Sequence, residues 1–263
     1  MLIFLKLGGS LITDKDVPFS VRKDTLRRLG IEILKAIKEN PDLRILIGHG
    51  SGSFGHSTAV QFGTLSGIQL AKDWLAFQKV WWAAHQLNQI VLKEFINLGL
   101  PIISLPASAS LVSSNRHVDR WITEPILSSL DNHLIPMVFG DVIIDKILGA
   151  TIFSTEELFS YLVKIFHPNR ILLSGKEKGV FLDYPKNRDL IKLITPDTYP
   201  SIVDKIFASS SMDVTGGMAS KVKSMLNLIS LEDNLSIDIF SGEEKDNLIR
   251  VISGENIGTK LSR

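Results

Sequence analysis

Short apolar runs alternate with longer amphipathic stretches along this chain of 263 residues, and this pattern predicts an α/β protein. The apolar runs predict strands at residues 2–7, 43–48, 101–105, 134–139, 142–144, 170–174, 179–182 and 236–240. The amphipathic stretches predict helices at residues 21–39, 68–97, 156–166, 217–229 and 245–252. Residues 45–47 and 171–173 carry no polar side chain, which favours strands covered on both faces. We therefore expect helices on both sides of a mainly parallel central sheet, with ligands bound at the carboxyl ends of its strands.

Composition narrows the class of protein by exclusion. The 29 Lys and Arg residues nearly balance 28 Asp and Glu residues, which argues against a nucleic-acid partner bound through a generally basic surface. Cys is absent, so disulfides, cysteine zinc sites, thiol nucleophiles and iron–sulfur clusters are excluded. Residues 1–6 lack the features of a signal peptide, and the charge-free stretches 45–71 and 95–115 are too rich in Gly, Pro or Ser for membrane spans. We expect a soluble, cytoplasmic protein without nucleic-acid or membrane partners.

Two predicted strands run directly into glycine-rich turns. The first turn reads K-L-G-G-S from Lys6 to Ser10, and the second reads G-H-G-S-G-S-F-G-H from Gly48 to His56. Glycine lets backbone N–H groups approach an anion without a Cβ in the way. Either turn alone is typical of a simple tight turn, whereas two such turns that carry Lys or His favour a phosphate site.

Three well-known nucleotide-binding motifs do not fit. The segment from Gly50 to Gly55 matches G-x-G-x-x-G, but a helical pattern follows it and Asp73 lies inside that pattern rather than at a strand end. The chain contains no G-x-x-x-x-G-K-[ST] motif, and the H-R-D and D-F-G motifs are also missing. A Rossmann oxidoreductase, a P-loop NTPase and a protein kinase are therefore disfavoured.

A third cluster precedes the helix predicted from residue 217. Asp213 or Thr215 can cap a helix that opens at Gly216 and Gly217. Lys221 would then lie early in that helix, where its charge opposes the helix dipole. That unfavourable placement favours a role in anion binding over that of a solvated surface lysine.

These segments, together with Lys15 and the pair Gly140-Asp141, resemble the amino acid kinase superfamily and, within it, the isopentenyl phosphate kinases. The resemblance spans residues 2–259. It implies a single three-layer α/β/α domain over residues 1–263, with an acceptor-binding part at about 1–165 and a nucleotide-binding part at about 166–263. It also implies transfer of the γ-phosphate of ATP to isopentenyl phosphate, Mg²⁺ bound through the ATP phosphates, and a homodimer.

The resemblance assigns roles to individual residues. The positions that it assigns to ATP binding are Lys6, Gly8, Gly9, Ser10, Gly52, Gly216, Gly217 and Lys221. Lys15 would stabilise the transition state, and Asp141 would orient the active-site lysines. His56 would hold the acceptor phosphate as a hydrogen-bond donor, and Ser51 occupies a position that contacts the substrate in the family. Lys6, Lys15 and Lys221 would offset the repulsion between two phosphate groups.

Three departures from the family pattern leave the acceptor and the nucleotide preference open. Ser51 stands where the family usually has glycine, and Thr155 replaces a glycine that contacts the acceptor phosphate in the family. Glu157 lies three residues after Ser154, the spacing of a capping box, so a helix can still begin here. Lys176 and Lys178 stand in a turn that is acidic in the family. Both lysines fit a solvated turn, and either could contact nucleotide phosphates.

The helix predicted over residues 68–97 carries an aromatic stripe. Trp74, Phe77 and Trp81 recur at spacings of three and four residues, which is typical of core packing. Because the stripe follows the second glycine turn, we hypothesise that some of these rings cover the hydrocarbon end of the acceptor. Two alternatives stay open: a kinase for another small phosphate or phosphonate, similar to fosfomycin kinases, and a non-catalytic binding protein with the same fold.

Overall fold

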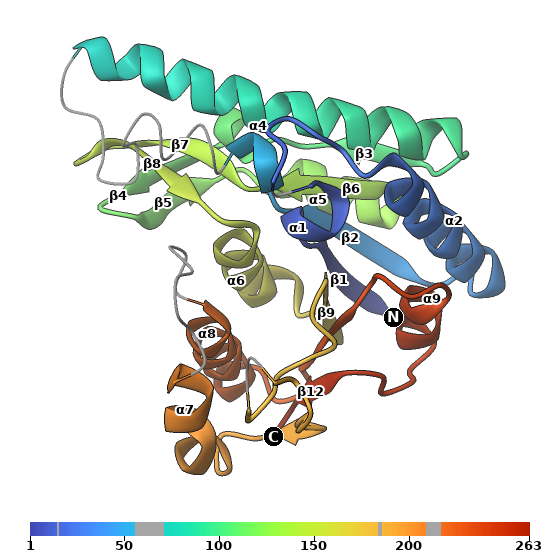
Figure 1. Ribbon diagram of the computed structural model, residues 1–263. Coiled ribbons are helices and arrows are strands. Elements are labelled where there is room, and N and C mark those ends of the chain that lie inside the picture. The colour runs from blue at the N-terminus through green and yellow to red at the C-terminus, as the bar shows by residue number, and fades with distance from the viewer. Residues whose placement is uncertain (15, 56–70, 184–185, 209–216) are drawn as a thin grey trace.

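An eight-stranded sheet forms the centre of the computed structural model, which describes residues 1–14, 16–55, 71–183, 186–208 and 217–263 (Figure 1). The strands lie in the order β10 (Leu193–Ile194), β12 (Thr259–Leu261), β11 (Ser236–Ser241), β9 (Arg170–Gly175), β1 (Leu2–Leu7), β2 (Arg44–His49), β6 (Ile135–Phe139), β3 (Ile102–Ser104). Only the pair β11–β12 is antiparallel. The mainly parallel sheet predicted from the apolar runs is confirmed.

Helices cover both faces of this sheet, as the uninterrupted apolar runs predict. Alternate residues of β1 serve the two faces: Ile3 and Leu5 join one core, while Phe4 joins the other. The first core packs against α1 (Gly9–Ile12), α2 (Lys23–Glu39), α4 (Ala71–Asn97) and α9 (Asn247–Ile252). The second packs against α5 (Glu124–Asp131), α6 (Thr155–Phe166), α7 (Tyr199–Ala208) and α8 (Gly217–Leu231). Figure 1 shows α4 on the upper side and α6 and α8 on the lower.

A second sheet of four strands lies beside the first and was not predicted. Its order is β5 (His117–Trp121), β4 (Leu111–Ser114), β7 (Asp141–Asp145), β8 (Gly149–Phe153). The short 3₁₀ helix η2 (Ala107–Ala109) precedes it. Only residues 142–144 of this sheet stood out in the sequence, because β4, β5 and β8 mix small and polar side chains.

The predicted helices form with boundaries that differ by a few residues. The helix α6 begins at Thr155 with the expected capping box, in which Glu157 N–H donates to Ser154 Oγ at 3.2 Å and Ser154 N–H donates to Glu157 Oε2 at 2.7 Å. Residues 68–70 of the helix expected over residues 68–97 lie outside the described residues. The strand expected at residues 179–182 does not form, and Phe181 makes only an isolated bridge to Leu190. No helix in the described ranges is long and apolar enough to cross a bilayer.

The position of β1 decides where the site lies. This strand is central in the sheet, with β2 on one side and β9 on the other. Leu7, its last residue, is in register with His49 of β2 and Ser174 of β9. The glycine-rich turns that follow β1 and β2 therefore leave the same edge of the sheet side by side, next to the end of β9.

Candidate active site

The two glycine-rich turns touch through their backbones. Gly50 N–H donates to Leu7 O at 3.0 Å. A Cβ on Gly9 would lie 2.7 Å from Gly52 Cα, and a Cβ on Gly50 would lie 2.8 Å from Gly9 N. Gly52 also has a φ of +50°, a conformation that favours glycine. Any side chain at these positions would force the turns apart, so the glycines set their close approach.

Thr13 bridges the two turns and was not singled out in the sequence. Its hydroxyl donates to Gly9 O at 2.7 Å and accepts from Ser53 N–H at 3.0 Å. The side chain is fully buried. A threonine after a short apolar run carries no sequence signal for such a bridge, because the partner Ser53 belongs to the second turn.

On the other side of β1, the first turn contacts the end of β9. Gly8 N–H donates to Ser174 O at 2.8 Å, and a Cβ on Gly8 would lie 3.0 Å from that oxygen. Ser174 Oγ is buried and has no hydrogen-bond partner within the described part of the chain. A buried hydroxyl without a partner is costly and marks a place where a ligand or water can bind.

Two lysines converge on one carboxylate at this edge. Lys6, from β1, points to the face that α6 covers, and its Nζ forms an ion pair with Glu156 Oε1. Lys221 Nζ, from α8, lies 3.7 Å from the same oxygen. Burial alone would raise the pKa of Glu156, but the charges of the two lysines lower it to about 2. Burial lowers the pKa of Lys6, against the opposing effect of Glu156.

The carboxylate that contacts the lysines is therefore Glu156, whereas the expectation for that role was Asp141. Asp141 accepts from Ser108 N–H at 3.0 Å and Val142 N–H at 2.9 Å, and its Oδ2 lies 3.7 Å from His85 Nε2. Glu156 escaped notice because an acidic residue in the first turn of a helix is ordinary for helix stability. Only its place beside the departure at Thr155 could have pointed to it.

Thr155 and Ser51 lie next to the second turn. Thr155 is buried, and its hydroxyl donates to His49 O at 2.7 Å, so it joins the start of α6 to the end of β2. Ser51 O accepts from the N–H groups of Phe54 and Gly55 at 3.1 and 3.2 Å, which closes a helical turn at residues 52–55. Both residues thus shape the backbone of the turn.

The aromatic stripe on α4 borders an apolar cavity of about 380 Å³. The cavity is lined by Phe77, Gln78, Trp81, His85, Pro106, Ser108, Ala109 and Ile144. Trp74 does not line it; this side chain is 42% exposed, and its ring packs on Phe77 with centroids 5.4 Å apart. Of the three aromatic residues singled out in the sequence, Phe77 and Trp81 therefore face the cavity.

The remaining sequence candidates lie in α1, in α8, after β9 or outside the described residues. Ser10 is half-buried in α1, and Gly217 begins α8 with a φ of +63°. Lys176 is exposed after β9, where its backbone oxygen accepts from Ser241 Oγ at 2.9 Å. Lys178 forms an exposed ion pair with Glu244 at 3.4 Å. Three further candidates, Lys15, His56 and Gly216, lie outside the described residues.

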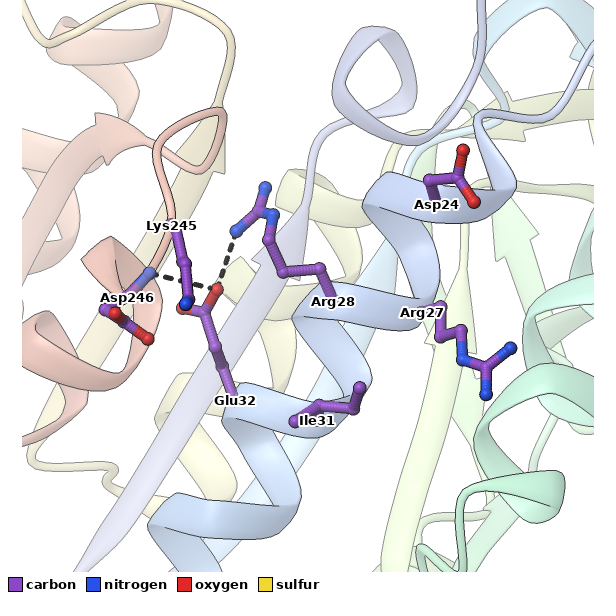
Figure 2. Close-up of a pocket in the computed structure, with 7 residues that line it drawn as sticks. All are labelled: Asp24, Arg27, Arg28, Ile31, Glu32, Lys245 and Asp246. Carbon is purple, nitrogen blue, oxygen red and sulfur yellow. Dashed lines mark hydrogen bonds and ion pairs between the residues drawn. The ribbon is translucent and has the colours of Figure 1, made fainter.

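A second cavity, of about 270 Å³, lies between α2 and the start of α9 (Figure 2). Its buried carboxylate, Glu32, accepts from Arg28 Nη1 at 2.6 Å and from the backbone N–H groups of Asp246 and Leu248 at 3.2 and 3.0 Å. These bonds hold α9 against α2. Because Glu32 already accepts these hydrogen bonds, its carboxylate has a structural role in joining the two helices.

The low pKa of Glu156 predicts a pH dependence of stability. Its folded pKa of about 2 lies below its ordinary value of 4.5, so its stabilisation is present above pH 4.5 and is lost as the pH falls toward 2. We expect Glu156→Gln to have a lower free energy of unfolding than wild type at pH 5. This difference should shrink by about 2 kcal/mol when the pH is lowered from 5 to 3. Urea unfolding at stepwise pH measures this difference. Glu39→Gln, at a 3.8 Å ion pair that is about half exposed, serves as the control, and an equal change in both variants would contradict the assignment.

The fold and the site together define an α/β phosphotransferase: glycine turns in backbone contact, beside paired lysines, at the carboxyl edge of a parallel sheet. A model of the Amino acid kinase family matches residues 1–241, and the chain belongs to that family.

Relatives and solved structures are similar over the full length. The isopentenyl phosphate kinase of Haloferax volcanii is 32% identical over 99% of this chain and 98% of its own, and that of Methanocaldococcus jannaschii is 29% identical over 99% and 98%. X-ray structures of isopentenyl phosphate kinase match with a TM-score of 0.82 at 27% identity, covering 100% of both chains. UMP kinase from Ureaplasma parvum, at 17% identity and a TM-score of 0.65, shares the fold.

Proposed function

We propose that this protein transfers the γ-phosphate of ATP to isopentenyl phosphate and forms the diphosphate. The observation that carries the proposal is the backbone contact between the two glycine turns, with Gly9 and Gly52 too close for any side chain. Such contact suits an enzyme that must bring two phosphate groups together. Full-length relatives that are named isopentenyl phosphate kinases support the choice of acceptor.

The residues around the turns fit bound ATP. Gly8 closely approaches β9 at this edge of the sheet. The hydroxyl of Ser174, which has no hydrogen-bond partner among the described residues, is a polar group that a ligand there could bind. Lys6 and Lys221 supply positive charge, and Glu156 holds both ammonium groups in place before substrates arrive. Bound ATP supplies the phosphoryl group, and Mg²⁺ held by its phosphate oxygens adds positive charge. Among the described residues, no group of three or more His, Asp or Glu could hold a metal ion by itself.

Lys15 and His56 complete the proposed site through the family resemblance. Lys15 would stabilise the charge of the transferring phosphoryl group, and His56 would donate a hydrogen bond to the acceptor phosphate. A phosphate acceptor is largely ionised near neutral pH, so the transfer needs no strong general base. The proposed enzyme works by positioning and charge neutralisation.

The apolar cavity supports a hydrocarbon-bearing acceptor over other small phosphates or phosphonates. Phe77 and Trp81 line it from α4, and Ile144 lines it from β7. Burial of each methylene group stabilises a complex by about 0.8 kcal/mol, so a five-carbon chain gains affinity that a polar phosphonate cannot.

A homodimer is proposed with this function, and light scattering of the purified protein tests it.

The acceptor is tested by ADP release with ATP and Mg²⁺ against a small panel. We expect the highest kcat/KM with isopentenyl phosphate, and a value about 50-fold lower with ethyl phosphate, which lacks three carbons of the chain. Dimethylallyl phosphate, fosfomycin and common amino acids complete the panel, and a reaction without acceptor measures background hydrolysis. Faster turnover of an acceptor without a phosphate or phosphonate would contradict the proposal.

A further inference from the structure

A buried chain of polar side chains ends at the second glycine turn. His49, the last residue of β2, has no exposed surface, and its ring stacks on Phe139 with centroids 5.2 Å apart. Its Nδ1 lies 3.1 Å from Gly50 O, and its Nε2 lies 3.3 Å from Asn88 Oδ1. The other end of the Asn88 amide, Nδ2, lies 2.7 Å from Ser104 Oγ. This series of hydrogen-bonded side chains thus runs from β3 through α4 to the backbone of the turn.

The protons in this chain have one consistent arrangement. Both ring nitrogens of His49 face oxygen atoms, so both would need a proton if the Asn88 amide kept its oxygen toward Nε2. Burial lowers the pKa of His49, which favours a neutral ring with a single N–H. The oxygen and nitrogen of an amide have the same shape, so rotation of the Asn88 amide by a half-turn satisfies every group. Ser104 then donates to Asn88, Asn88 donates to Nε2, and Nδ1–H donates to Gly50 O.

The other neutral tautomer is disfavoured by the same distances. With the proton on Nε2, the lone pair of Nδ1 would face the Gly50 carbonyl oxygen at 3.1 Å without a hydrogen between them. Two acceptors at that distance repel, and the His49 ring has no exposed surface through which water could separate them. The Nδ1–H tautomer removes this conflict.

We propose that His49 is a positioning residue for the acceptor phosphate. Its Nδ1–H bond holds the Gly50 carbonyl toward the protein interior, so that N–H groups rather than a carbonyl oxygen of the turn face the acceptor. This inference rests on the proposed function, in which the second turn binds the acceptor phosphate. His49 acts through Gly50 and touches no substrate.

Two variants at His49 separate this role from packing. In His49→Asn the amide nitrogen occupies the place of Nδ1, and in His49→Gln it occupies the place of Nε2. Both variants lose the stack on Phe139, while the backbone oxygen of residue 49 keeps its bonds from Thr155 Oγ1 and Gly140 N–H. We expect His49→Gln to raise the KM for isopentenyl phosphate about five- to tenfold, the effect of one hydrogen bond. His49→Asn should stay within about twofold, with the KM for ATP unchanged in both. Equal acceptor KM values in the two variants would overturn the proposal.

A measurement on the wild-type protein tests the proton arrangement without any acceptor. ¹⁵N chemical shifts of the His49 ring should report a neutral Nδ1–H tautomer from pH 6 to pH 8. An imidazolium or an Nε2–H tautomer in that range would overturn the inference. Failure of wild type to phosphorylate isopentenyl phosphate would instead contradict the proposed function, so the two failures are distinguishable.

Discussion

Replacing Lys6 by methionine is expected to lower kcat about 10³-fold, the loss seen when one preorganised positive group is removed from a phosphoryl-transfer site. Methionine keeps roughly the length and the apolar stem of lysine. This similarity matters because the Lys6 side chain is only 13% exposed. What is lost is the charge between the two glycine turns and Glu156. Steady-state kinetics with saturating ATP and isopentenyl phosphate measures the effect.

A stability measurement separates lost catalysis from lost folding. Lys6→Met leaves Glu156 with Lys221 as its remaining partner at 3.7 Å, so the variant should also unfold more easily. The double variant Lys6→Met with Glu156→Gln removes both charges and should recover stability but no activity. Lys35→Met, at a side chain 61% exposed, controls for the loss of a positive charge in general. Normal kcat in the Lys6 variant would exclude Lys6 from the catalytic machinery.

Replacing Gly9 by alanine is the second large effect we expect. The new Cβ would lie 2.7 Å from Gly52 Cα, and because this obstacle is backbone, no side-chain rotation relieves it. Overpacking of this kind costs about 1–3 kcal/mol of unfolding free energy. Moving the turns apart by about 1 Å should lower kcat/KM about 10²-fold or more, since phosphoryl transfer depends on alignment. Urea unfolding and steady-state kinetics measure the two effects.

Gly175→Ala is the matched control for Gly9→Ala. A Cβ there would have no neighbour closer than 4.0 Å, and Gly175 is not among the residues with a positive φ. It should therefore keep wild-type stability. If Gly9→Ala proved as stable and as active as Gly175→Ala, the contact between the turns would not set the geometry of transfer.

The parts of the fold that the sequence predicts are those with strong local signals. Buried parallel strands are continuous apolar runs, and all but one of the eight predicted strands form. The exception, residues 179–182, satisfies its backbone outside a strand ladder: Val180 N–H donates to Thr259 Oγ1 of β12 at 2.8 Å, and Val180 O accepts from Ile191 N–H at 2.9 Å. An apolar run alone does not reveal such long-range partners.

The turns of the second sheet, whose strands mix small and polar side chains, are organised by a single carboxylate. Asp145 accepts from the N–H groups of Asn115, Arg116, Ile147 and Leu148, and these bonds, together with one from Ser113 Oγ, lower the pKa of Asp145 against the effect of burial. Ser113, Asn115 and Arg116 lie close to Asp145 only in the folded chain, and Ile147 and Leu148 belong to the adjacent turn. Sequence spacing therefore gave no signal for them.

The residues of the candidate site also fall into two groups: those with a local sequence signal and those that only the folded structure reveals. The glycine turns directly follow β1 and β2, and Lys6 lies near the end of β1, so Lys6, Gly9 and Gly52 could be proposed from local pattern and resemblance. Glu156 and Thr13 act through partners more than 30 residues away, and each is ordinary in its own segment. A residue whose role lies in a distant contact needs the folded structure to reveal it.

The backbone contact between the two turns divides the proposed site into a part set by main-chain atoms and a part set by side chains. In the proposed function, main-chain atoms of Gly9, Gly50 and Gly52 would set the separation of the two phosphate groups, and most side-chain substitutions leave these atoms in place. In the proposed function, the far end of the acceptor would instead meet side chains such as Phe77 and Trp81 of the apolar cavity, which can be exchanged one at a time. A chain built in this manner can acquire a new acceptor by point substitution while the transfer geometry is inherited intact.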